Sequence, residues 1–196
     1  MSSSSKPLFL AKEKLMSRFK QTKDPRGNTA LEALYKEILE AGAEGSEPGV
    51  PNNLVTSLSE RPDLLAPTWE LFKGVVMGGV VPSTVKEMIL MAIAMQNDCQ
   101  YCSVAHTRAL EAMGVPTEVI QSCTSDPELA QVPPLQRAMI KFGLKTARDP
   151  KSVTDDDFQT LRDHGLSDGE IMEVTMLAAA GNFLDTWAHV SGIQVD

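Results

Sequence analysis

The sequence predicts an all-helical protein, and three observations carry that prediction. Hydrophobic residues make up 42% of the 196-residue chain, but aromatic residues make up only 5%. Helix-favouring Ala, Leu, Met, Glu and Lys are frequent, whereas runs of β-branched residues are few. Apolar residues recur at helical spacing in several segments that Gly- or Pro-containing turns separate. The length suits a single domain with its own hydrophobic core.

Charge divides the chain into two parts. Residues 1–26 hold seven Lys or Arg and two acids, whereas residues 27–196 hold 11 basic and 24 acidic side chains, a net charge of −13. We therefore expect a basic, flexible N-terminal segment over 1–26 and one helical domain over 27–196. Two interpretations of the segment stay open: a tail with a short surface helix, which its Lys-rich composition favours, or a mitochondrial transit peptide. The acidic body argues against a nucleic-acid partner.

The cysteine content indicates a reducing compartment. Three cysteines do not form a secreted disulfide scaffold, and the sequence shows no secretory signal and no apolar run of about 18 residues. We therefore expect a cytoplasmic protein without a membrane partner. In such a compartment a close cysteine pair is more often catalytic, redox-active or metal-binding than structural.

Two helices are expected before the centre of the chain. Residues 29–42 have an amphipathic pattern, and a Gly- and Pro-containing loop follows at 45–53. A second helix opens at 61–63 and ends at Gly78–Gly79, with Trp69 and Phe72 in its core-facing run.

The central helix over 83–96 is apolar nearly all round, which is typical of a helix in the middle of a bundle. Asn97 and Asp98 predict a sharp break that caps the next helix. A helix is expected over 99–113. After a short segment holding Cys123, further helices are expected over 134–148, 155–163 and, from a capping box at 167–170, a long final helix. This last helix resembles the central one, so we expect a degenerate internal repeat in which Asp185 and Ala188 fall near the positions of the cysteines.

The residues that carry chemistry lie between 87 and 106. On a helix from residue 99, Cys99, Cys102 and His106 share one face, with Cys102 and His106 four residues apart. Cys99 in the first helical turn would gain acidity from the helix dipole. A fold-back at 97–98 would bring Glu87 level with His106, so that Glu87 orients His106 and His106 serves Cys102 as a base.

This pattern of Glu87, eleven residues, Cys99-Gln-Tyr-Cys102, three residues and His106 resembles the signature of the AhpD-like alkylhydroperoxidase branch of the carboxymuconolactone decarboxylase superfamily. The resemblance covers residues 65–115, with the signature region at 82–115, and the NFLDTWAHVSG ending resembles the tail of peroxidase-related members. The sequence departs at Tyr101, where the best-known peroxidase has a histidine.

The resemblance implies an AhpD-like helical bundle that forms trimers or hexamers and reduces organic hydroperoxides or hydrogen peroxide without a cofactor or metal. It assigns Cys102 as the peroxidatic nucleophile, Cys99 as the resolving thiol, and His106 with Glu87 as the proton relay. An external thiol, such as a lipoyl dithiol or a thioredoxin-like protein, would reduce the resulting disulfide.

Other interpretations of the same residues stay open. The cysteines could be two small buried side chains. With His106 they could bind zinc, although structural zinc sites have four ligands. Glu87 could close a capping box with Thr84, and His106 could be a core histidine. Cys123, His164 and His189 have no partner at useful spacing and are read as structural.

At the level of function, two alternatives to a peroxidase stay open. One is a non-redox lyase or isomerase of the same superfamily, against which the dithiol counts. The other is a sensing or interaction protein whose dithiol switches an assembly. The Met- and Ala-rich apolar helices also predict a buried contact between subunits.

Overall fold

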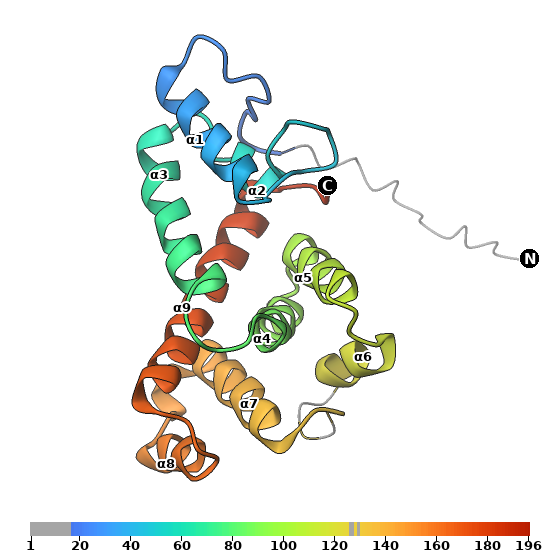
Figure 1. Ribbon diagram of the computed structural model, residues 1–196, viewed down its shortest axis with the longest axis vertical. Helices are drawn as coiled ribbons and strands as arrows, with labels where there is room; N and C mark the ends of the chain where they lie inside the picture. The colour runs from blue at the N-terminus through green and yellow to red at the C-terminus, as the bar shows by residue number, and fades with distance from the viewer. Residues whose placement is uncertain (1–16, 126–127, 129) are drawn as a thin grey trace, which may run out of the picture.

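The computed structural model describes residues 17–125, 128 and 130–196, and over these residues it contains helices and a single isolated β-bridge between Glu44 and Pro51. The central helix is α4 (Ser83–Gln96), seen nearly end-on in Figure 1. Around it lie α5 (Gln100–Ala112), α6 (Thr117–Ser125), α7 (Pro134–Arg148) and α9 (Asp168–Ser191). The predicted all-α class is confirmed.

Close packing fixes α4 in this position. Its side chains from Met88 to Ala94 are all buried, as its apolar sequence requires. Two glycines let the neighbouring helices approach it. A Cβ atom on Gly143 of α7 would lie 2.7 Å from Cγ2 of Ile89, and one on Gly181 of α9 would lie 3.2 Å from Cδ2 of Leu90. The backbones of α7 and α9 therefore pack directly against α4.

A second, smaller core lies beside the bundle. It is built by α1 (Thr29–Glu40), α2 (Asn53–Thr56) and α3 (Pro62–Leu71), at the top of Figure 1. The stripe predicted for residues 29–42 is its main contributor. The buried residues of this cluster are Leu31, Tyr35, Ile38, Val55, Leu65 and Trp69.

The second predicted helix consists of two parts. After α3, the chain continues as a π-helical segment, η1 (Phe72–Met77), which ends at Gly78. The buried amine of Lys86 on α4 donates hydrogen bonds to the carbonyls of Val75 and Gly78 and forms an ion pair with Glu173. These bonds satisfy carbonyl groups that the end of a helix leaves free.

The later elements match their predicted ranges, with one exception. The helices α7 and α8 (Asp155–Asp163) have the predicted bounds, a short 3-10 turn, η3 (Pro150–Ser152), joins them, and a capping box at Ser167 and Glu170 opens α9. The segment around Cys123, expected as a short connection, forms helix α6. It does so because Ile120 and Cys123 bury one stripe of the segment against the core.

The described part of the basic leader is packed on the bundle. Residues 1–16, which hold most of the possible transit sequence, lie outside the described residues. Over residues 17–26, Arg18 donates to the carbonyls of His189 and Val190, and Phe19 stacks on Trp187 with ring centroids 5.3 Å apart. Arg18 and Phe19 are thus held against the C-terminal end of α9 by its carbonyls and an indole ring.

No helix in the described part of the chain has the length and apolar character to cross a bilayer.

Candidate functional site

The site is built at the corner between α4 and α5. Asn97 caps the C-terminus of α4, and Asp98 turns the chain with φ of 55°, a left-handed conformation that Asp tolerates better than most residues. The sharp break predicted here is confirmed. The predicted capping role of Asn97 and Asp98 is wrong, since Cys99 is the N-cap residue of α5. The amide of Asn97 is turned to α9, where it donates to Asn182 and Asp185.

The fold-back brings Glu87 and His106 together. Oε2 of Glu87 on α4 lies 2.7 Å from Nδ1 of His106 on α5, and both side chains are about 15% exposed. The alternative that Glu87 closes a capping box with Thr84 is wrong, because α4 begins at Ser83 after an N-cap at Pro82 without a side-chain bond. The carboxylate of Glu87 is thus free to hold the imidazole ring in one orientation.

The two thiols are free and buried. Cys99 is 1% exposed and Cys102 3%, and they form a small cluster with apolar neighbours from four segments. Cys102 lies one helical turn before His106, on the same face of α5. The neighbouring side chains that cover the pair are Leu54, Ala94, Tyr101, Trp187, Ala188 and Ile193.

A carboxyl group from α9 completes this cluster. Asp185 of α9 is 4% exposed, and one oxygen of its carboxylate and the sulfur atoms of Cys99 and Cys102 all lie within 4.8 Å of one another. In the expected repeat, Asp185 stood near the position of a cysteine. The helix α9 is continuous, however, and lacks the break that follows α4, so the likeness of the two helices is limited to their apolar runs.

The two thiols differ in acidity. A hydrogen bond from the Cys102 thiol lowers the pKa of Cys99, although burial acts in the opposite direction. The same hydrogen bond, together with burial and the charge of Asp185, raises the pKa of Cys102 above its usual range. Cys99, at the N-terminus of α5, is therefore the more acidic of the two thiols.

Tyr101, which replaces a histidine of the best-known relative, points its hydroxyl group elsewhere. Its hydroxyl donates to Oδ2 of Asp196 over 2.9 Å and accepts a hydrogen bond from the N–H of Leu54 over 3.2 Å. Burial raises the pKa of Tyr101, and the nearby Asp196 adds to this effect. The phenol therefore stays neutral and secures the C-terminal segment over the thiols.

The zinc alternative takes a different form in the structure. Among the described residues, the set that could hold a metal ion is Cys99, Cys102 and Asp185, and His106 is not part of it. Structural zinc sites use four protein ligands almost without exception. Three ligands of this kind thus give no positive argument for a structural zinc ion.

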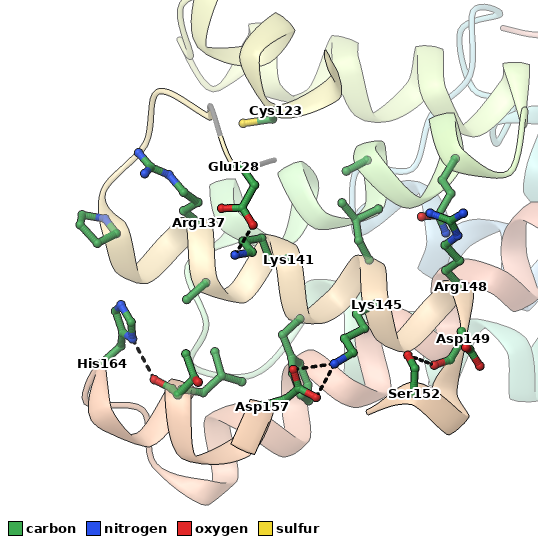
Figure 2. A pocket seen from close by; sticks show the side chains of 18 of the residues that line it. Cys123, Glu128, Arg137, Lys141, Lys145, Arg148, Asp149, Ser152, Asp157 and His164 are labelled. Atoms are coloured by element: carbon green, nitrogen blue, oxygen red, sulfur yellow. Dashed lines mark hydrogen bonds and ion pairs between the residues drawn. The ribbon is translucent and has the colours of Figure 1, made fainter. Parts of the chain in front are cut away.

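A large cavity of about 1140 Å³ lies away from the dithiol, between α7, α8 and the end of α4. Figure 2 shows cationic side chains of α7 along it, two of which are paired: Lys141 with Glu128, and Lys145 with Asp157. Cys123 and His164, which are not residues of the signature, line this cavity. None of Glu87, Cys99, Cys102, His106 and Asp185 is among its lining residues.

Comparison with known proteins shows what this arrangement is similar to. The family model for carboxymuconolactone decarboxylases matches residues 62–139, which include the whole α4–α5 corner. Comparison with curated protein sequences finds no match.

Solved structures share the complete fold. A peroxidase-related protein from Ralstonia eutropha JMP134, described as an alkylhydroperoxidase AhpD core, is 26% identical over 92% of each chain, with a TM-score of 0.78. A peroxidase-related protein from Silicibacter sp. TM1040 is 19% identical over 92% of this chain and 95% of its own, with a TM-score of 0.77. The debrominase Bmp8, solved with 2,3,4-tribromopyrrole, is 19% identical over 92% of this chain and 94% of its own, with a TM-score of 0.72.

The latter two similarities, at 19% identity, show a shared fold alone. The family model and the 26% identical AhpD core show that this chain is similar to the carboxymuconolactone decarboxylase family and to its AhpD-like members.

Proposed function

We propose that the protein is a thiol-dependent peroxidase that reduces hydroperoxides through Cys99 and Cys102. The observation that carries this proposal is the free, buried cysteine pair at the start of α5, on the helix face that also holds His106 in contact with Glu87. A thiolate is the nucleophile that attacks a peroxide bond, and an adjacent imidazole can hold the proton that the reaction needs. The similarity to the peroxidase-related protein from Ralstonia eutropha supports this proposal.

In the first step, the sulfur of Cys102 attacks one oxygen of the peroxide and the O–O bond breaks. His106, held by Glu87, takes the proton of the Cys102 thiol and gives it to the leaving oxygen, so an alcohol or water is released. Cys102 becomes a sulfenic acid. In the second step, Cys99 attacks the sulfur of Cys102, water leaves, and a disulfide forms.

The acidity of the thiols is compatible with this order. The hydrogen bond to Cys99 and burial raise the pKa of Cys102, so a base must remove its proton, and this step produces the attacking Cys102 thiolate. The proximity of His106 to Cys102 along α5 favours Cys102 as the attacking residue. Cys99 then acts as the resolving thiol.

An external thiol must reduce the disulfide, because the two electrons that reduce the peroxide come from the pair itself. A lipoyl dithiol or a thioredoxin-like protein has suitable chemistry. We propose no cofactor or metal for the reaction. The non-redox lyase alternative would leave the dithiol without a role. A sensing protein would react with peroxide once, whereas a peroxidase reacts over many turnovers.

We also propose that the protein is a homo-oligomer, a trimer or a hexamer. Apolar side chains are exposed along one side of α9 and around η1, where a single chain leaves them in contact with water. The most exposed of them are Met77, Val80, Met172, Met176, Phe183 and Val190. An exposed apolar surface of this kind commonly marks a contact between proteins. Sedimentation of the purified protein as a monomer would contradict this part of the proposal.

Steady-state turnover tests the proposed activity. Purified protein is incubated with cumene hydroperoxide or hydrogen peroxide and with dithiothreitol or dihydrolipoamide, and peroxide loss is followed over many turnovers. We expect consumption that Cys102→Ser abolishes and that Cys123→Ser, which removes the third buried thiol, leaves in place. A single turnover without recycling would favour the sensing alternative.

A further inference from the structure

Beside the thiol pair lies a buried carboxyl group, that of Asp185, which has no part in the reaction steps proposed above. Asp185 is 4% exposed, and its carboxylate accepts a hydrogen bond of 2.8 Å from the amide of Asn97. In the described part of the chain no Lys, Arg or His forms an ion pair with it. Burial of a carboxylate without a cation costs folding free energy. Its presence beside the thiols therefore points to a further role.

The proton balance of disulfide formation identifies a role. In the proposed first step His106 takes the proton of Cys102, and the Cys99 thiol keeps its own proton. The second thiol cannot close the disulfide until it has lost this proton. An acceptor must therefore lie beside both sulfur atoms.

We infer that Asp185 accepts the proton of the thiol that attacks second and returns it to the group that leaves. In the reaction with a peroxide, Asp185 takes the proton from Cys99, Cys99 attacks the sulfenic sulfur of Cys102, and the departing hydroxide receives the proton and becomes water. The carboxylate is regenerated in each cycle. The inference rests on the proposed thiol chemistry of the pair but not on the identity of the oxidant.

The other titratable groups around the pair are already engaged. Glu87 and His106 bind each other, and the proposed first step already uses them. The hydroxyl group of Tyr101 donates to Asp196. Asp185 is thus the acid–base group whose oxygen lies within 4.8 Å of both sulfur atoms.

The test uses an oxidant that is not a peroxide. A Cys123→Ala background leaves the pair as the reacting thiols, and 4,4′-dithiodipyridine releases one coloured thiopyridone when the first thiol reacts and another when the second closes the disulfide. Asp185→Asn should slow the second release by about 10²-fold or more, the usual contribution of a general base. The first release should not slow, and Asp185→Glu should restore part of the second.

A titration of thiolate absorbance in the ultraviolet provides an independent readout. Because the charge of Asp185 disfavours a thiolate next to it, Asp185→Asn should move the titration of the pair to lower pH. Asn97→Ser removes the amide donor but keeps the carboxylate, and should retain a fast second release. If Asn at position 185 prevents folding, Asp185→Ser repeats both measurements.

Two results would overturn the inference. One is an unchanged second release together with an unchanged titration in Asp185→Asn. The other is a gain in thiol reactivity when a chelator is added to the wild-type protein, which would indicate a metal ion on the same three side chains. If wild-type protein fails to turn over peroxide but Asp185→Asn still slows the second release, the peroxidase proposal fails and the inference stands.

Discussion

Glu87 and His106 are 19 residues apart in the sequence, yet their side chains meet at 2.7 Å across the fold-back between α4 and α5. The contact depends on the turn at Asp98, which reverses the chain so that the two helices run antiparallel. A carboxylate in this position fixes the orientation of the imidazole ring. The structure thus gives His106 the geometry of a base whose ring cannot turn away.

Removal of this pair should impair peroxide turnover. We expect His106→Gln to lower kcat/KM by about 10²-fold or more, since proton transfer by a positioned side chain commonly contributes that much. Glu87→Gln should give a rate between those of His106→Gln and wild type, because the imidazole remains but loses its orienting charge. Steady-state kinetics measures both. Glu111→Gln, an exposed acid on α5, is the control and should match wild type.

The close approach of α7 to α4 predicts a stability effect at Gly143. A Cβ atom there would lie 2.7 Å from Ile89, which is too short for a normal contact. We expect Gly143→Ala to destabilise the protein by about 1–3 kcal/mol through overpacking, partly offset by a gain of up to about 1 kcal/mol in helix propensity. Urea denaturation gives the difference. Gly169→Ala in the first turn of α9, where the nearest atom is 3.8 Å away, should not destabilise.

The buried ion pair between Lys86 and Glu173 predicts a dependence of stability on pH. Burial alone would raise the pKa of Glu173, but hydrogen bonds from Lys86, Val80 and Val81 lower it below 4.5. The stability that this group contributes is therefore present above about pH 4.5 and is lost as the pH falls through the lower folded-state pKa. Denaturant unfolding at a series of acidic pH values measures this loss.

At neutral pH, Lys86→Met should cost about 3–5 kcal/mol, because it leaves the carboxylate of Glu173 buried without a cation. The double variant Lys86→Met with Glu173→Leu should recover part of that loss. Equal stability of the single and double variants would contradict a coupled pair.

Much of the fold could be predicted from the sequence because its signals are local. The Ser83–Gln96 helix has a continuous apolar run, and the final helix has a capping box at Ser167, so their bounds follow from nearby residues alone. The helix around Cys123 was missed because its short apolar stripe becomes significant only when it packs against the core. The bonds of Arg18 depend equally on a distant partner, the end of α9.

The site could be predicted in part for the same reason. Glu87, Cys99, Cys102 and His106 lie within 20 residues, so helix geometry and one turn suffice to bring them near one another. Asp185 could not be placed beside the thiols, because it is 88 residues from its partner Asn97 and reaches the site through the packing of α9 on α4. The available signal was an acid within the apolar Ala-rich run of the last helix, where a charge needs a reason to be buried.

The most direct test of the central claim combines intact mass with thiol counting before and after one equivalent of cumene hydroperoxide. We expect rapid loss of two thiols and of two hydrogens in mass from the wild-type protein, with a sulfenic acid trapped on Cys102 in Cys99→Ser and none in Cys102→Ser. A reaction no faster than that of free cysteine would contradict the peroxidase proposal and favour a non-redox enzyme or a structural pair. A sulfenic acid trapped on Cys99 in Cys102→Ser alone would keep the peroxidase and reverse the two roles.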